Sequence, residues 1–179
     1  SDIDKNNSVI DLNNYDFIPG GAFNIFEKLR NKSKNKIKII YSGNAYETRT
    51  DRSKHPTSDK ENKSFKYPII YSITKKKGIK LFYSSEKDDK IFVPKVVWSN
   101  GIGTYPIVDL DGSYGLTQFS YGISDLPKNL NDIKKALEHP EFIKLMSYVK
   151  FTENKYNYKI IGTFEPDFYK YFLSGEKIK

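Results

Sequence analysis

Several residue types that support particular chemistries are absent or scarce in this chain. It has no cysteine, which excludes disulfide bonds and thiolate metal sites. Only three of its 30 basic residues are arginine. No apolar run approaches the roughly 20 residues that a membrane-spanning helix needs, and the polar first seven residues lack the features of a signal peptide. We therefore expect an intracellular protein without a membrane partner.

Catalytic signatures of DNA-modifying enzymes are missing as well. An amino-methyltransferase needs two adjacent prolines in its target-amino motif, whereas all eight prolines here are isolated. The segment 17–21 imitates a glycine-rich cofactor loop poorly and does not follow an expected strand. The one Pro-Asp pair, Pro166-Asp167, comes after every acid-x-Lys pair, which is the wrong order for a metal-dependent nuclease. We expect no catalytic residue, no metal and no bound cofactor in this chain.

Other polar features carry little sign of chemistry. The two histidines, His55 and His139, are far apart in sequence, and each is expected to be exposed to solvent rather than to act as a ligand or base. Residues 47–64 contain no apolar side chain and predict a long exposed loop. Asp109 and Asp111 resemble part of a calcium loop, but the remaining ligands are missing.

The charge is strongly positive. The formal net charge is +8, from 30 basic and 22 acidic residues. Lysines on a protein surface attract polyanions and release counterions when they contact phosphates. The same composition is also typical of a lysine-, asparagine- and isoleucine-rich protein from an AT-rich genome. Composition alone leaves both explanations open.

Aromatic residues are abundant at 15%, and strand-like runs recur through the middle of the chain. Alternating or continuous apolar runs predict strands. They span residues 37–42, 67–73, 79–85, 95–99, 105–110, 116–123 and 156–164. Lys75-Lys76-Lys77-Gly78 and Asp111-Gly112 have the composition of hairpin turns. In the continuous strand 116–123, Gln118, Ser120 and Ser124 would share one face.

Helical periodicity is concentrated in the last third of the chain. A short helix is expected around residues 23–29, and others begin at Asn131, Pro140 and Pro166. Strands followed by helices predict an α+β fold, a twisted and mainly antiparallel sheet with helices packed on it. We expect residues 1–14 to be a polar linker and residues 15–179 to form one domain.

Polar and aromatic residues at turns are the candidates for ligand contact. Asparagine and glutamine amides can pair with adenine edges, and arginine can pair with guanine. Lys54 and Lys75–Lys77 are the expected phosphate contacts. The expected base contacts are Arg49, Arg52, Asn100 and Gln118. Trp98 adds a large ring beside the Asn100-Gly101 turn. Taken singly, Gln118 is better explained as a residue that satisfies a hairpin, and Trp98 as a core residue.

Five sequence segments follow one another in an order that resembles a known protein family. Residues 67–78 (YPIIYSITKKKG), 92–97 (FVPKVV), 109–118 (DLDGSYGLTQ), 149–152 (VKFT) and 164–169 (FEPDFY) follow one another. This succession resembles the C-terminal, target-recognition-like region of adenine-specific DNA methyltransferases and fused restriction–modification enzymes, including giant-virus versions. The similarity spans about residues 26–172. Its most specific pieces are the Pro-Lys-Val and Tyr-Gly-x-Thr-Gln segments. Phe151 stands where this pattern has tryptophan.

The resemblance implies a module that selects a double-stranded DNA site while a separate domain, in the same or a partner chain, methylates the base. S-adenosylmethionine is then expected in that catalytic domain. The matching segments add Lys95, Tyr114 and Lys150 to the DNA-contact candidates. The alternative is a structural or protein-interaction domain that kept the fold and lost DNA reading. A nuclease fused to a recognition domain is disfavoured by the motif order.

Overall fold

The computed structural model describes residues 20–32, 35–48, 53–101, 105–152, 155–156 and 158–174, with the side chains of 151, 152, 155 and 156 left aside. It has two mainly antiparallel four-stranded sheets and a set of helices that lie mostly in the C-terminal part. The α+β class predicted from the sequence is therefore confirmed. The expected linker, residues 1–14, lies outside the described ranges.

The sheet in the middle of the molecule, here the central sheet, is antiparallel throughout. Its strand order is β1-β8-β5-β6, made of β1 (Lys38–Tyr41), β8 (Ser120–Ser124), β5 (Lys95–Ser99) and β6 (Ile107–Asp109). The second sheet, here the outer sheet, has the order β2-β4-β3-β7. It contains β2 (Thr57–Ser58), β4 (Gly78–Ser84), β3 (Tyr67–Thr74) and β7 (Gly115–Leu116), and β7 runs parallel to β3.

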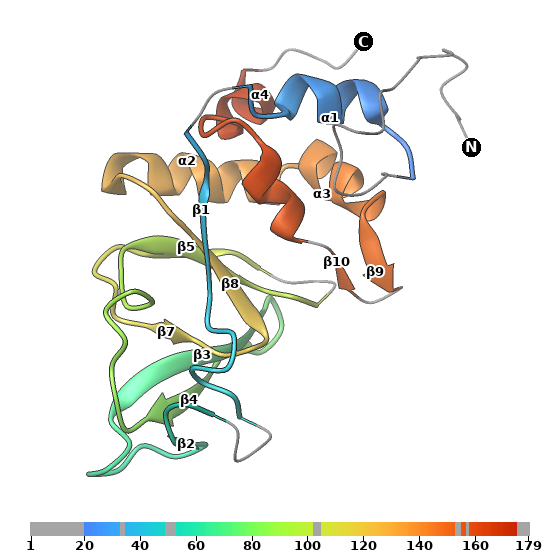
Figure 1. Ribbon diagram of the computed structural model, residues 1–179. Coiled ribbons are helices and arrows are strands. Elements are labelled where there is room, and N and C mark those ends of the chain that lie inside the picture. Colours follow the sequence, from blue (N-terminus) through green and yellow to red (C-terminus); the bar gives the residue numbers. More distant parts are fainter. Residues whose placement is uncertain are drawn as a thin grey trace.

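The helices form a third layer on the far side of the central sheet, as Figure 1 shows. They are α1 (Phe23–Leu29), α2 (Pro127–Glu138), α3 (Pro140–Ser147), the 3-10 helix η2 (Tyr158–Thr163) and α4 (Tyr169–Leu173). A short hairpin of β9 (Lys150–Thr152) and β10 (Lys155–Tyr156) lies between α3 and η2. Within the described ranges, no helix has the length and apolar character needed to cross a bilayer.

Strand β5 is covered on both faces, and its five residues are all buried. Val96 and Trp98 belong to the core cluster shared with the helices, whereas Val97 belongs to the cluster shared with the outer sheet. This assignment follows from the two-residue period of a strand, which sends neighbouring side chains to opposite faces. A strand buried on both faces has a continuous apolar run in its sequence, so residues 95–99 were predicted with the right limits.

Side-chain hydroxyl groups tie the two sheets together. The carbonyl oxygen of Ile70 in β3 accepts hydrogen bonds from Thr117 N at 3.1 Å, Thr117 Oγ1 at 3.0 Å and Ser120 Oγ at 2.8 Å. The chain therefore turns at residues 117–119 and passes from the outer sheet to the central one. The prediction of one continuous strand over 116–123 was wrong, and so was the shared face for Gln118 and Ser120.

Three other local predictions need correction. Residues 158–163 form η2 instead of a strand, with Tyr158, Ile160 and Ile161 buried. Helix α2 begins at Pro127, four residues before Asn131. Gly112 has the expected positive φ of 65°, but β6 and β7 belong to different sheets, so Asp111-Gly112 is not a hairpin turn. Proline is favourable at the first position of a helix, because its fixed φ is close to the helical value. The N–H that proline lacks would have no partner within the helix at that position.

The segment after β1 is anchored more firmly than its polar composition predicted. His55 is buried and its ring packs on Tyr46 at a centroid distance of 5.2 Å. Its Nδ1 lies 2.9 Å from a carboxylate oxygen of Glu86. Strand β2, within the same segment, pairs with β4. The expectation of an exposed His55 was therefore wrong. The expected exposed loop over residues 47–64 is interrupted by β2 and by the buried His55, whereas residues 54, 56 and 59–64 are exposed.

Tyr46 is the buried centre of this anchor. Its hydroxyl accepts from Asp88 N at 2.6 Å and donates to Glu86 O at 3.2 Å. Burial, assisted by the charges of Asp88, Glu86 and Asp89, raises the pKa of Tyr46 to about 12. The folded state favours the protonated form of Tyr46 over the tyrosinate. The stabilisation that this preference gives is complete below the ordinary tyrosine pKa near 10 and is lost as the pH rises from 10 towards 12.

We therefore expect alkaline destabilisation that depends on Tyr46. Between pH 10 and 12 the free energy of unfolding should fall by about 1.4 kcal/mol per pH unit from this group. Burial also raises the pKa values of Tyr121 and Tyr169, which adds to the slope. Urea unfolding followed by circular dichroism at pH 8, 10 and 11 measures it. Tyr46→Phe should be less stable at pH 8 by about 1 kcal/mol yet show a shallower pH slope; parallel losses would identify another group.

Candidate nucleic-acid interface

The turn between β3 and β4 presents three exposed lysines, Lys75, Lys76 and Lys77. The hairpin is formed as predicted, with Thr74 opposite Gly78. Gly78 has a φ of 67°, which a glycine adopts without steric cost. The N–H of Lys77 donates to Thr74 Oγ1 at 3.1 Å. The turn therefore holds three ammonium groups at one end of the outer sheet.

Two further turns meet this end of β3. The N–H of Asn100, directly after β5, donates to Phe119 O at 2.9 Å. Ser99 Oγ accepts from the N–H of Ile73. Together, residues 71–74, residues 99–101 and Phe119 enclose an open recess of about 220 Å³. The structure thus brings the lysine turn and Asn100, both predicted as DNA contacts, to the same edge.

Gln118 directly precedes Phe119 of the recess, and its amide bonds to the chain after Tyr46, at Thr48. Its Oε1 accepts from Thr48 N at 3.2 Å, and its Nε2 donates to Thr48 Oγ1 at 3.1 Å. An amide has two acceptor lone pairs and two donor hydrogens, so one of each remains for another partner. Thr48 directly precedes residues 49–52. Arg49 and Arg52, two predicted base contacts, lie outside the described residues.

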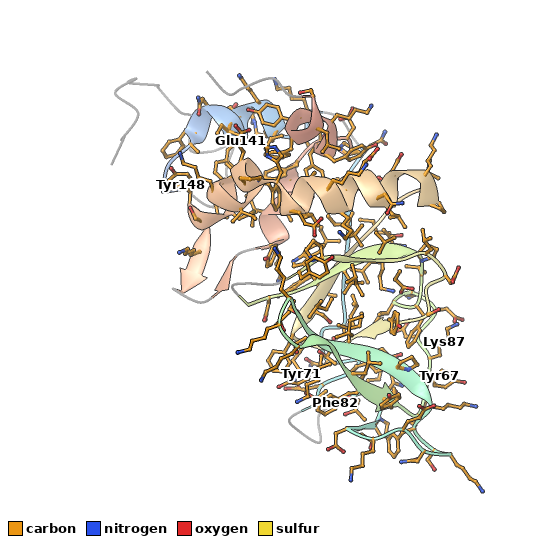
Figure 2. All side chains as sticks on the ribbon, turned by 180° about the vertical axis from the view of Figure 1, so that it is seen from behind. Tyr67, Tyr71, Phe82, Lys87, Glu141 and Tyr148 are labelled. Atoms are coloured by element: carbon orange, nitrogen blue, oxygen red, sulfur yellow. The ribbon has the colours of Figure 1, made fainter. Side chains whose placement is uncertain are left out.

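A row of aromatic rings crosses the outer sheet beside the recess. The Tyr71 ring stacks on Phe82 at 4.9 Å with an interplanar angle of 21°, and it meets the Phe119 ring at 4.9 Å with an interplanar angle of 59°. Lys80 Nζ lies 4.7 Å from the centroid of Tyr71 and 5.5 Å from that of Phe82. Figure 2 shows Tyr71 and Phe82 together on the β3–β4 ribbon, away from Glu141 and Tyr148 of the helical layer.

Sequence reasoning missed this aromatic row, although the hairpin turn held a signal for it. A turn at residues 75–77 places Lys80 opposite Ser72, and the register shift beyond Ser72 brings Phe82 opposite Ile69. Tyr71 is the extra residue of a β-bulge, because Ile70 and Ser72 pair with the consecutive residues Leu81 and Lys80. Bulges re-aim side chains and are frequent next to functional sites. The pairing from the turn as far as Ser72 could be derived, but the bulge, and with it the partner of Phe82, could not.

Lys95 was predicted to contact DNA, and its position in the structure contradicts this. The side chain is fully buried and donates to Asp109 Oδ2 at 2.7 Å, Tyr114 O at 2.6 Å and Val93 O at 3.0 Å. Burial lowers the pKa of Lys95, while the hydrogen bond to Asp109 opposes that shift. All three donor hydrogens of the ammonium group are used inside the protein, so Lys95 presents nothing to a duplex.

Trp98 is also removed from the set of DNA contacts. It is 1% exposed and packs against Tyr121, at a centroid distance of 6.4 Å, and against Tyr158, at 5.1 Å. Strand alternation points its side chain towards the helices, as it does for Val96. The indole therefore belongs to the core under α2 and η2, and the competing interpretation of Trp98 as a core residue is correct.

The remaining candidates do not join the edge formed by Lys75–Lys77 and Asn100. Tyr114 is half-buried beside the Lys95–Asp109 pair. Lys150 is exposed in β9, next to the helical layer. Lys54 is exposed, and its N–H donates to Asn44 O at 2.9 Å. The predicted set thus divides into a convergent group and dispersed residues.

The chemistry available at this edge consists of ammonium groups, amides and aromatic rings. Within the described part of the chain, no group of three or more histidine or carboxylate side chains is placed to hold a metal ion. Comparison with protein-family models, with curated proteins and with solved structures found no match to this chain.

Proposed function

We propose that this chain is a sequence-specific double-stranded DNA recognition module of an adenine-specific DNA methyltransferase or restriction–modification enzyme, non-catalytic by itself. The single observation that carries the DNA part is the meeting of Lys75–Lys77 and Asn100 at one edge of the fold. Lysines on phosphates set position, and amides on base edges specify sequence. The methyltransferase connection rests on the resemblance of the sequence alone.

The division of labour at this edge follows from reach and hydrogen-bonding capacity. The three lysines of the turn are exposed point charges that suit phosphates. Asn100 is half-buried at the recess, and no side-chain hydrogen bond engages its amide among the described residues. An asparagine amide has the donor and acceptor that pair bidentately with adenine N6 and N7. We assign Lys75–Lys77 to the backbone and Asn100 to a base edge.

Salt dependence tests the proposal. If the module neutralises about five phosphates, log affinity should fall against log salt with a slope near −4.5, because each contact contributes ~0.9. Lys75→Ala, Lys76→Ala and Lys77→Ala combined should flatten the slope by up to ~2.7 and weaken random and preferred duplexes alike. Fluorescence anisotropy at several salt concentrations measures this.

A matched control removes the same charge elsewhere. Lys28, Lys128 and Lys144 are exposed on α1, α2 and α3 of the helical layer. Their combined replacement by alanine changes the net charge equally and should leave most of the slope intact. Equal flattening by both triple variants would place the DNA elsewhere. No binding at low salt would reject the DNA proposal and leave the structural or protein-interaction alternative.

A further inference from the structure

The recess beside the lysine turn contains aromatic rings, which are not needed to contact the base edges or phosphates of a paired duplex. Its volume is about 220 Å³. Tyr71 and Phe119 form one wall, with ring centroids 4.9 Å apart. Asn100 and Thr74 add polar groups to the rim of the recess. A planar ligand with polar edges fits this combination of an aromatic wall and a polar rim.

Contacts within the protein hold the two rings of the aromatic wall in place. Phe82 stacks on Tyr71, and Lys80 lies over both rings. Phe119 is fixed by its carbonyl, which accepts from Asn100 N at 2.9 Å, and its N–H donates to Thr117 Oγ1 at 3.3 Å. Because these contacts are made within the protein, the wall is ordered before any ligand arrives.

The positive charge next to the recess indicates which kind of molecule the planar ligand belongs to. Lys75 follows Thr74 of the recess rim directly, and Lys76 and Lys77 continue the exposed turn. Ammonium groups beside an aromatic surface are the arrangement with which proteins bind unpaired nucleotides, since bases stack on rings and lysines track the phosphates. A neutral planar metabolite would leave this row of lysines unused.

We propose that the recess binds one unpaired nucleobase of the bound DNA, against Tyr71 and Phe119, with Asn100 on the base edge and Lys75–Lys77 on the flanking phosphates. The inference rests on the proposed DNA-recognition function and assigns a second, stacking mode of contact to the same edge. Paired bases present only their edges in a groove, whereas an unpaired base offers its face to a ring.

Two duplexes of one sequence test the inference. One is fully paired, and the other carries a single unpaired 2-aminopurine, whose fluorescence falls on stacking. The wild-type chain should bind the second about 5- to 150-fold more tightly, the value of one base–aromatic contact of ~1–3 kcal/mol, and quench its fluorescence. Phe119→Leu keeps an apolar side chain without a ring and should remove most of that preference and the quenching, so that the two duplexes bind with nearly equal affinity.

Phe65→Leu supplies the matched control, because Phe65 is a half-buried phenylalanine in the turn before β3. It should leave the preference intact, and thermal melting checks that both variants fold. Asn100→Ala should weaken the preference and retain quenching by the wall. Equal affinity for the two duplexes, unaltered by Phe119→Leu, would overturn the recess inference and leave DNA recognition standing. Failure to bind either duplex would overturn both, and binding of the unpaired form alone would support the recess and overturn the duplex function.

Discussion

Replacing Lys95 with alanine is expected to lower the free energy of unfolding by about 3–5 kcal/mol. The substitution removes the cationic partner of the Asp109 carboxylate, whose side chain is 2% exposed, and leaves a buried charge held only by the N–H groups of Ser113 and Tyr114. It also removes donors from Tyr114 O and Val93 O. The three acceptors come from separate segments, so their simultaneous loss loosens the junction of β5, β6 and the chain leading to β7. Urea unfolding at pH 7 measures the effect.

An exposed ion pair supplies the control for Lys95. Lys135 Nζ lies 3.2 Å from Asp132 Oδ1, with side-chain exposures of 64% and 45%. Lys135→Ala should therefore change stability by less than about 0.5 kcal/mol. Lys95→Met preserves part of the buried volume and should still be strongly destabilising, since Asp109 remains charged and buried. A loss below about 1 kcal/mol for both Lys95 variants would show that Asp109 finds water or another partner.

Trp98→Ala is the second substitution with a large expected effect, about 3–5 kcal/mol, because it leaves a cavity beside Tyr121 and Tyr158 in the core. Trp98→Phe should cost much less. The phenyl ring keeps the contact with both tyrosines, and the lost indole Nε1 has no hydrogen-bond partner among the described residues. Since Trp98 is the single tryptophan of the chain, circular dichroism rather than fluorescence should follow unfolding.

The same variants separate a core role from a contact role. Trp98→Phe should bind duplex DNA with the affinity of the wild-type chain, because a side chain that is 1% exposed does not reach a surface ligand. A tenfold or greater loss of DNA affinity in a folded Trp98→Phe variant, at unchanged salt slope, would place the indole at the interface. Such a result would require the central sheet to open on binding.

The local sequence pattern predicted the secondary structure correctly where residues close in sequence determine it. The β3–β4 hairpin follows from Gly78, and the helix at Pro140 follows from its fixed φ and the spacing of Phe142, Leu145 and Met146. Strand β5 follows from its continuous apolar run. In each case the information lies within about ten residues, which is the range that periodicity and turn chemistry can report.

The local sequence pattern gave wrong predictions where a group distant in the sequence determines the structure. The break at Thr117 depends on the carbonyl of Ile70, 47 residues earlier in the chain. The burial of His55 depends on Tyr46 and Glu86. Residues 158–164 have apolar side chains at spacings that suit a strand or a tight helix equally, and packing on the central sheet selects η2.

The candidate site divides in the same way. Exposed lysines at a glycine turn could be predicted, because charge and turn composition are local properties. Lys95 could not be recognised as buried from its own surroundings, since Asp109 lies 14 residues away. Its place at the start of a strand buried on both faces was the available signal. The convergence of Asn100 with Phe119 required the order of strands, which no local pattern contains.

The bulge in β3 has a consequence for chain length. Ile70 and Ile73 are both buried although they lie three positions apart, because the bulge adds Tyr71 between them. In a regular strand, residues three positions apart point to opposite faces. Loss of Tyr71 would restore strict alternation and keep both isoleucines inward. Elsewhere in β3 a deletion would instead reverse the faces of the strand. Chains of this fold can therefore differ by one residue here, altering the recess wall while leaving the core unchanged.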